Sequence, residues 1–397
     1  MNSPSPSDVS PTARDLRTGQ AALEDFALAP ELTHLNHGSY GAVPNSVLAE
    51  QECIRREVER NPTGFFSEVY PRGVRQAAAV AAEYFGGRVD DWVFCENATS
   101  AINSVLASLP LRAGDELLTT SHAYGAVLRA MRLWAERNGA TLRIAEVPAV
   151  VESQSQVAEA IAGALTARTR LLVVDHITSP TATVFPVAEI VRRAHDAGIP
   201  VLVDGAHAPG HLALNVPEIA ADWYTGNAHK WFFAPRGCGV LWTARKWQAI
   251  TRPAVLSHGT DQGYTAAFDW IGTRDASPWL SLPKAAEAFD RFGGAALMAR
   301  NRALAAAAAN HIAERTKGVL TAPTSMRPAM ATVRLSQAAD LEGAIKVRRK
   351  LAEGGFVIAT NAFGGQLCIR ISAQIYNDRI DYDRFADALL SLGIPLQ

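Results

Sequence analysis

VLVDGAHAPGH (residues 201–211) and DWYTGNAHKW (222–231) are the two stretches that decide how this chain folds. Asp204 closes an apolar run of the kind that forms a buried strand. In an open α/β sheet, ligands bind beyond the carboxyl ends of the strands, so this acid indicates where a site lies. Taken alone, Asp204 is interpreted equally well as a helix cap or a turn residue. The surrounding sequence decides between these interpretations.

Apolar runs alternate with helical patterns on both sides of this stretch, from about Asp91 to Thr243. The runs are rich in Val and Leu and do not alternate with polar residues, which is typical of strands buried on both faces. This order predicts an α/β fold, a mainly parallel sheet flanked by helices. The predicted helices include 126–137, 156–165 and 187–197, and the predicted strands are 92–95, 116–120, 141–147, 170–175, 200–204 and 239–243.

The pattern changes after Pro283. An Ala-rich helical stretch over 285–316 precedes shorter strands and a closing helix near 381–391. These elements predict a smaller α+β domain at 281–397, completed by the N-terminal segment. The large domain is predicted at 31–280 and an N-terminal arm at 1–30. Its first twelve residues are rich in Ser and Pro, have nothing to bury, and are expected to be disordered. The shorter strands are 331–335, 356–359 and 366–371.

Composition and charge exclude several classes of protein. The 397 residues are 48% hydrophobic and 19% charged, which excludes a disordered or collagen-like chain. The formal net charge of -1 gives no overall basic field for nucleic acid. Four widely separated cysteines fit neither a disulfide framework nor a zinc site. No apolar run approaches the roughly 20 residues that span a bilayer. We therefore expect a cytoplasmic protein without a membrane or metal partner.

Lysine is scarce in this chain, with six residues against 32 arginines, and the first lysine is Lys230. Where arginine is used almost everywhere, a lysine suggests a need for an amine that can lose its proton. A chance surface lysine is the alternative interpretation. Lys230 follows Asp204 by 26 residues and lies within GNAHKW (226–231). This pairing suits a lysine that forms a Schiff base with pyridoxal 5'-phosphate (PLP) and a carboxylate that keeps a proton on the ring nitrogen.

Eight segments carry a resemblance to a known family: LNHGSYGAVP (35–44), ENATSAINSV (96–105), SHAYGAV (121–127), SPTATVFPV (179–187), VDGAHAPGH (203–211), GNAHKW (226–231), GTRD (272–275) and RISAQIY (370–376). In this order, over about residues 30–392, they resemble the isopenicillin N epimerase-like branch of the class V aminotransferases. The resemblance implies a PLP-dependent transferase of fold type I, with 31–280 as the PLP-binding domain. The same branch also contains C–S lyases.

The resemblance implies roles for residues around the cofactor. Lys230 is expected to form the Schiff base, and Asp204 to bind the pyridine nitrogen. Tyr124 is expected to stack on the ring face, where it completes the catalytic set. His207 is expected near the phenolic oxygen of the cofactor, with Ser179 in the same region. Tyr124 is interpreted alternatively as a core aromatic residue, and His207, like His229, as an ordinary buried or loop histidine. Thr99, considered next, is alternatively only a helix N-cap.

A phosphate site is implied by the same resemblance. The amides of Ala98 and Thr99 open a helical pattern, and a helix N-terminus binds phosphate well. Asn227 and His229 are expected to complete this phosphate site. Thr273 is expected to reach the phosphate of a second subunit, so the resemblance implies a homodimer with active sites shared across the interface.

Arg370 lies in the strand-like run LCIRIS, where a charge needs a partner. The resemblance implies that it binds the α-carboxylate of a small amino-acid substrate; a structural ion pair is the alternative. Asn36, His37 and Tyr40 come from an N-terminal segment that closes over the site in relatives, and they are expected to contact substrate. The string NHGSYG also reads simply as a turn.

Three reactions at Cα of the substrate stay open. Epimerisation or racemisation is preferred because SPTATVFP, GTRDASPWL and RISAQIY match the epimerase pattern. It needs a second acid besides Lys230, for which His37, Tyr40 or a water are candidates. β-Elimination from a cysteine conjugate or sulfoxide uses Lys230 as the only base, and transamination is the third reaction. A persulfide-forming desulfurase is not expected, because TAPTSMRPAMAT (321–332) contains no cysteine.

Proteins of other classes fit the sequence less well. A catalytically silent binding protein with this fold has no need for Lys230, Asp204 and Arg370 together. A Rossmann-type dehydrogenase is disfavoured because no GxGxxG follows an early strand. The substrate side chain is undetermined, since four aromatic residues are equally consistent with a substrate pocket and with the core: Phe65, Phe66, Trp270 and Trp279.

Overall fold

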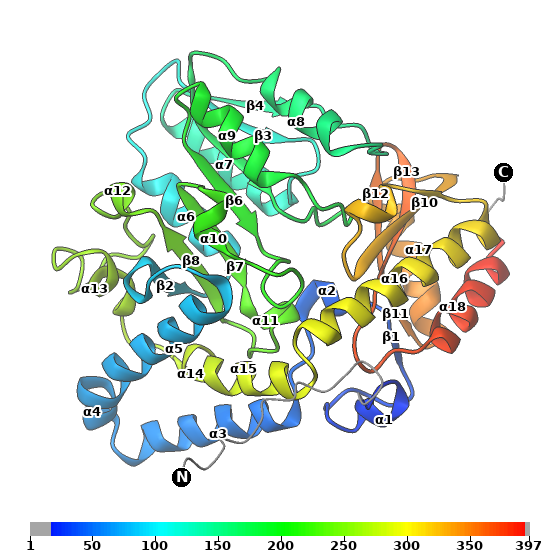
Figure 1. Ribbon diagram of the computed structural model, residues 1–397, viewed down its shortest axis with the longest axis horizontal. Helices are drawn as coiled ribbons and strands as arrows, with labels where there is room; N and C mark the ends of the chain where they lie inside the picture. Colours follow the sequence, from blue (N-terminus) through cyan, green and yellow to red (C-terminus); the bar gives the residue numbers. More distant parts are fainter. Residues whose placement is uncertain (1–16, 394–397) are drawn as a thin grey trace, which may run out of the picture.

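A seven-stranded sheet forms the centre of the larger part of the molecule (Figure 1). The structure is a computed structural model that describes residues 17–393, so the predicted disordered stretch at 1–12 lies outside it. The strand order is β2-β8-β7-β6-β5-β3-β4, in which β8 alone runs against the others. The bounds are β2 (Trp92–Cys95), β3 (Glu116–Thr120), β4 (Thr141–Ala145), β5 (Thr169–Asp175), β6 (Val201–Gly205), β7 (Trp223–Asn227) and β8 (Gly239–Thr243).

Strand β7 is not among the strands predicted from the sequence. Its sequence WYTGN ends in Gly and Asn, which are typical of turns. Pairing with β6 on one side and β8 on the other, together with complete burial, overrides that local preference. The short helix α11 (Ala228–Trp231) follows β7 at once. The other six predicted strands are confirmed, and so is the mainly parallel sheet.

Helices cover both faces of this sheet. Leu171, Val173 and Leu202 lie on the face covered by α6 (Ala98–Ser108), α7 (Gly125–Arg137) and α13 (Tyr264–Asp269). The residues that alternate with them, such as Leu172 and Val203, pack on the opposite face. The helices there are α5 (Tyr70–Phe85), α8 (Gln154–Ala162), α9 (Val187–Asp196), α14 (Ser277–Leu280) and α15 (Leu282–Arg291).

The smaller part of the molecule is built on an antiparallel sheet of order β12-β13-β10-β9. The N-terminal segment joins it as predicted, since β1 pairs with β11 and Leu35 lies in its core. The strands are β1 (Thr33–His34), β9 (Val319–Leu320), β10 (Met330–Ala338), β11 (Phe356–Val357), β12 (Ala359–Phe363) and β13 (Gln366–Ser372), and the helices are α16 (Ala295–Thr316), α17 (Leu341–Glu353) and α18 (Arg379–Ser391).

The helical stretch predicted at 285–316 is two helices, α15 and α16. Gly293 and Gly294 separate them with φ of 99° and 50°, a conformation that favours glycine. Helix α15 packs against α5 and α3 (Asn45–Arg60) of the larger part. Leu297, in the first turn of α16, still belongs to the core of the larger part, and Ala305 further along α16 belongs to the core of the smaller part. The boundary at 281 stays a prediction.

The remaining elements are short and connect these layers (Figure 1). Helix α2 lies between the two sheets, where its residues reach the site described below. Among residues 17–393, no helix is both long and apolar enough to cross a membrane. The bounds are α1 (Gln20–Leu23), α2 (His37–Tyr40), α4 (Pro62–Gly64), a π-helical turn (Phe65–Val69), α10 (Val216–Ile219) and α12 (Arg245–Gln248).

Candidate active site

Lys230, Asp204 and His207 meet at the carboxyl edge of the large sheet. Asp204 is buried near the end of β6, and its Oδ1 accepts a hydrogen bond from the amide of Ala206 at 2.9 Å. Lys230 lies on α11, with its Nζ 3.3 Å from Nε2 of His207. Three residues singled out in the sequence therefore come together at the edge where α/β sheets bind ligands.

Charge and burial make Lys230 an unusual lysine. Burial, and next the charge of Arg370, lower its pKa to about 7, while Asp204 acts in the opposite direction. Burial raises the pKa of Asp204 itself. Burial and the charge of Lys230 lower the pKa of His207 well below its ordinary value. The lysine amine thus loses its proton near neutral pH, which suits a nucleophile and a proton carrier.

The N-terminus of α6 lies against the end of β7. The side chain of Asn97 caps the helix by accepting the amide of Ser100 at 3.0 Å. Oδ1 of Asn227 accepts the amide of Ala98 at 2.8 Å. The amide of Ala98 is therefore engaged within the protein, which differs from its predicted contact with a phosphate. Across residues 17–393, no group accepts from the amide of Thr99, which stays available for one.

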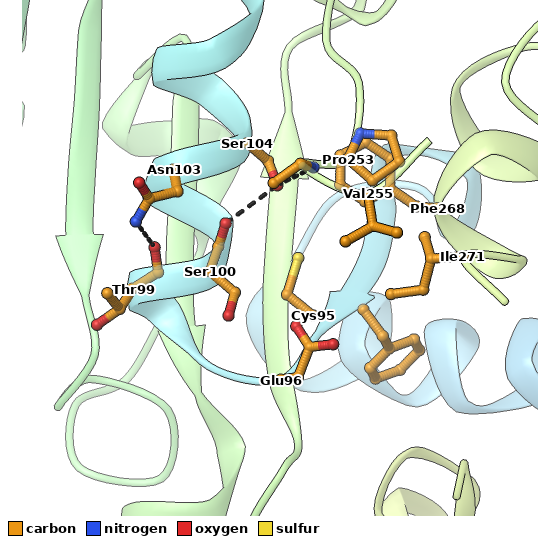
Figure 2. A pocket seen from close by; sticks show the side chains of 12 residues that line it. Cys95, Glu96, Thr99, Ser100, Asn103, Ser104, Pro253, Val255, Phe268 and Ile271 are labelled. Carbon is orange, nitrogen blue, oxygen red and sulfur yellow. Dashed lines mark hydrogen bonds between the residues drawn. The ribbon is translucent and has the colours of Figure 1, made fainter. Parts of the chain in front are cut away.

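A cavity of about 390 Å³ opens at this helix end (Figure 2). Glu96, Thr99 and Ser100 line one side of it, and Val255 and Ile271 the other (Figure 2). None of the sheet-edge residues lines it. The cavity therefore lies beside the first turn of α6, where Thr99 is one of its lining residues.

The loop that contains Thr273 is fixed beside the same helix. Nη1 of Arg274 donates to Oε1 of Glu96 at 2.6 Å, and its guanidinium lies over the ring of Trp279. Thr273 is therefore held close to α6 of its own chain. Its contact with the phosphate of a second subunit stays a prediction.

Arg370 reaches from β13 to the other parts of the molecule. Nη1 donates to the carbonyl and hydroxyl oxygens of Ser179 at 2.7 and 3.1 Å. Nη2 donates to Oδ1 of Asn36 at 3.1 Å and to Oγ of Ser39 at 2.9 Å. The side chain is buried, its Nε has no partner, and burial lowers its pKa to about 10. No carboxylate within residues 17–393 pairs with it, so its charge is available to an anion, with Nε–H as the donor that has no partner.

In the structure, the side chains of Ser179 and Asn36 contact Arg370, a contact that the sequence did not predict for either residue. Ser179 was expected beside the phenolic oxygen of the cofactor, and Asn36 beside the substrate. Both side chains instead accept hydrogen bonds from Arg370. They orient the guanidinium, because its planar fork offers each of them a separate nitrogen.

His37 lies beneath the lysine, which differs from the predicted contact with substrate. Its Nδ1 is 2.9 Å from the hydroxyl of Tyr376, and its Nε2 is 2.8 Å from the carbonyl oxygen of Lys230. The ring packs against Trp231, and burial lowers its pKa to about 3. Both nitrogens are engaged and the ring stays neutral, so His37 supports the backbone of Lys230 and has no free nitrogen for a proton transfer.

Two tyrosines are exposed beside Arg370. Tyr40, at the end of α2, is 72% exposed, and Tyr124, just before α7, is 49% exposed. Both phenol groups lie close enough to act on the charge of Arg370. Their positions are compatible with a ligand between them and the sheet edge. The stacking of Tyr124 on the cofactor and the contact of Tyr40 with substrate stay predictions.

The four aromatic residues considered for the substrate side chain do not line the sheet edge. Phe65 and Trp279 are buried in the core of the larger part. Phe66 and Trp270 pack edge to face with ring centroids 5.8 Å apart and line a separate cavity of about 520 Å³. That cavity includes none of the residues around Lys230.

The residues at the sheet edge fit PLP. Nδ1 of His207 and Nδ1 of His229 are both buried without a partner, so each can bind an oxygen of a ligand. Asp204 offers a carboxylate to a ring nitrogen, and Thr99 offers an amide and a hydroxyl to a phosphate. Lys230 supplies the amine that a Schiff base requires. This donor set matches each polar group of the cofactor.

Three residues with roles here were not singled out from the sequence: Ser39, which binds Arg370, Asn97, which caps α6, and Asp175, which pairs in register with Asp204. The signal for Asp175 was present, because it closes the apolar run 170–175 as Asp204 closes 200–204. The contact of Ser39 joins segments 331 residues apart and has no local signal.

Relatives with known names match most of the chain. An isopenicillin N epimerase of Streptomyces clavuligerus is 32% identical over 386 residues, which cover 92% of this chain and 96% of the relative. A second one, from Amycolatopsis lactamdurans, is 31% identical and covers 94% and 98%. A putative L-cysteine desulfhydrase 1 of Oryza sativa subsp. japonica is 30% identical and covers 91% and 83%.

Solved structures share the fold. A C-DES mutant with glycine covalently linked to its PLP cofactor superimposes with a TM-score of 0.80 at 20% identity, covering 92% of this chain and 98% of its own. An apo cysteine desulfurase from Thermococcus onnurineus NA1 gives a TM-score of 0.78 at 17% identity, covering 95% and 98%. The fold is therefore that of the fold type I PLP enzymes. Residues 56–385 match the family described as aminotransferase class-V. The chain belongs to the class V aminotransferase family, whose cofactor is PLP.

Proposed function

We propose that this protein is an epimerase or racemase of the isopenicillin N epimerase type, acting at Cα of an amino acid or an amino-acid-derived substrate. Two observations in one site carry the proposal. Burial and the charge of Arg370 lower the pKa of Lys230 to about 7, and the buried Arg370 has no acidic partner among residues 17–393. The arginine suits an α-carboxylate, and the lysine suits a proton at Cα. The isopenicillin N epimerases among the relatives support this choice of reaction.

Each residue has one task in this proposal. PLP, when bound, withdraws electrons from Cα of an attached amino acid and so makes its hydrogen acidic. Arg370 holds the α-carboxylate in its planar fork. Lys230 takes the proton from Cα on its own side of the substrate, and the opposite configuration forms when a proton is delivered from the other side. Asp204 favours the protonated ring nitrogen by its charge.

Inversion at Cα also needs a proton donor on the side away from Lys230. His37 does not serve, because both of its nitrogens are engaged and it stays neutral. Tyr40 has an exposed phenol on the N-terminal segment, near Arg370 and therefore near the proposed carboxylate. We assign the second proton transfer to Tyr40.

A C–S lyase is the second candidate, favoured by the L-cysteine desulfhydrases among the relatives. β-Elimination from a cysteine conjugate or sulfoxide needs Lys230 as its only base, so it makes no use of Tyr40. Transamination is a third possibility on the same residues. A persulfide route lacks a nucleophile, since Cys53 is the exposed cysteine and lies on α3, whereas Cys95, Cys238 and Cys368 are buried.

We also propose that the protein acts as a homodimer in the cytoplasm. The proposal is supported by the resemblance, which implies that Thr273 reaches the phosphate of a second subunit, and by the position of its loop beside the residue before α6. Light scattering of the PLP-loaded protein tests the dimer. A monomer with full activity would rule out composite sites.

Proton NMR in heavy water tests the reaction. The PLP-loaded protein is incubated with a panel of L-amino acids, cysteine conjugates and sulfoxides, and Lys230→Ala serves as the matched control. Deuterium at Cα together with the opposite configuration supports an epimerase or racemase. Pyruvate with a released thiol or sulfenate would replace that proposal by a C–S lyase.

A further inference from the structure

A second carboxylate lies directly beside Asp204. Asp175 is the last residue of β5, and the parallel pairing of β5 with β6 places it opposite Asp204. Neighbouring strands are about 4.8 Å apart. Side chains alternate along a strand, so Asp175 points to the same face as Leu171 and Val173, and Asp204 to the same face as Leu202. Leu171, Val173 and Leu202 all lie on the side covered by α6 and α7. The side chains of Asp175 and Asp204 therefore point to the same face of the sheet.

Hydrogen bonds hold the two strand ends together at this point. The amide of His176 donates to the carbonyl oxygen of Asp204 at 2.8 Å. The ring of His176 bonds through Nδ1 to the hydroxyl of Tyr224, at 2.8 Å, on the next strand. The backbone that carries Asp175 is therefore tied to both β6 and β7, and the two acids have little freedom to separate.

The surroundings offer less positive charge than two ionised carboxylates need. Both acids are 5% exposed. In the part of the chain that the structure describes, Lys230 is the cation whose charge acts on them, and its own pKa lies near 7. Asp204 also receives the amide of Ala206, which stabilises its anion. Tyr224, on the next strand, is an uncharged phenol and adds no positive charge, since burial raises its pKa well above the ordinary value.

We propose that Asp175 and Asp204 form a carboxyl pair that holds one proton at neutral pH, with Asp175 as its protonated member. Two buried like charges on adjacent strands cannot both ionise without a large cost, so one of them keeps its proton. Burial and the charge of Asp204 raise the pKa of Asp175 in agreement with this assignment. Asp204, with the amide of Ala206 beside it, is the charged member.

Asp175 is then a positioning residue that acts through Asp204. The pair presents a single negative charge, which matches the single positive charge of a protonated pyridine ring. An ionised Asp175 would add a second negative charge beside the ring, where, among residues 17–393, Lys230 is the cation whose charge acts on the pair. This role is independent of whether the enzyme epimerises its substrate or eliminates from it, so a failure of the reaction proposed above leaves it unaffected.

Infrared titration of the PLP-loaded enzyme tests the pair. The infrared band of a protonated carboxyl group is separate from the bands of carboxylates, and its frequency shifts in heavy water. The spectrum of the wild type is compared with that of Asp175→Asn at pH 7 to 9. This range leaves out Asp269, whose pKa burial raises to about 6. Asp222→Asn is the matched control, because Asp222 is equally buried but binds Lys246 at 2.7 Å and His195 at 2.8 Å.

The expected result is one protonated carboxyl group at pH 7 that disappears in Asp175→Asn and persists in Asp222→Asn. In Asp204→Asn the negative neighbour is gone, so the titration midpoint of Asp175 should fall by about one pH unit or more, a tenfold or greater increase in its acid dissociation constant. A band that survives Asp175→Asn, or a midpoint that does not move in Asp204→Asn, overturns the proposal. The Asp204→Asn shift decides it alone if Asp175→Asn fails to fold.

Discussion

The low pKa of Lys230 leads to a prediction with a definite size. An ordinary lysine has a pKa of about 10.4, so at pH 7 roughly one amine in 2,500 is unprotonated. Burial and the charge of Arg370 lower the pKa of Lys230 to about 7, so about half of this amine is unprotonated at the same pH. At pH 7, Lys230 should therefore react with amine-specific reagents about a thousand times faster than the same lysine would with the ordinary pKa of a peptide.

The assay is a short pulse of such a reagent on the protein stripped of PLP, at pH 5.5 to 9.5, followed by digestion and mass spectrometry. The exposed lysines of the same digest provide the reference for reagent and pH. Labelling of Lys230 should rise about tenfold per pH unit below pH 7 and level off above it. Denatured protein, in which burial is lost, should show no plateau in this range.

Two variants test the cause of the shift. Arg370→Met removes a positive neighbour, so the labelling midpoint of Lys230 should move to higher pH. Asp204→Asn removes a negative neighbour that favours the ammonium, so the midpoint should move to lower pH. A wild-type midpoint above pH 9, or a shift of the wrong sign in either variant, refutes the reasoning.

Further predictions concern the chemistry of single residues. Lys230→Ala should abolish turnover while thermal unfolding stays cooperative; measurable turnover contradicts its role. Asp204→Asn should bind PLP more weakly, as measured by fluorescence titration, and should slow the exchange of the Cα hydrogen by orders of magnitude. An unchanged exchange rate would contradict the role of Asp204 at the ring nitrogen. Arg370→Lys should raise KM about 10- to 100-fold, since one charge-assisted hydrogen bond contributes about 1.5–3 kcal/mol. Tyr40→Phe should slow inversion by about 100-fold and leave hydrogen exchange in the retained configuration intact; equal loss of both rates argues against Tyr40 as the second acid.

The large sheet was predictable because its strands are continuous apolar runs, whose burial on both faces leaves a clear local signal. Two departures have the same origin. WYTGN at 223–227 has the composition of a turn and becomes a strand because β6 and β8 flank it. The stretch 285–316 has the composition of one helix, and Gly293 and Gly294 divide it. In both places tertiary pairing or a backbone requirement outweighs local preference.

The site was predictable to the extent that its residues lie at strand ends and helix starts. Lys230, Asp204 and His207 meet as their positions in the sequence suggested. The role of His37 was not predictable, because both of its partners come from distant segments and neither is visible in NHGSYG. The contact of Asn36 with Arg370 likewise joins residues 334 positions apart. Such contacts depend on how the small sheet docks against the large one.

Arg370 shows how this docking bears on function. It belongs to the small sheet, yet it binds Ser179 of the large part and Asn36 and Ser39 of the N-terminal segment. The binding of a carboxylate to this guanidinium therefore depends on the relative position of these three segments. In the proposed function Lys230, Asp204 and Arg370 serve every reaction at Cα, so they support the proposed substrate class and leave the outcome open. The outcome depends on what lies opposite the lysine, and Tyr40, carried by the same N-terminal segment that holds Arg370, is the residue whose removal separates the reactions.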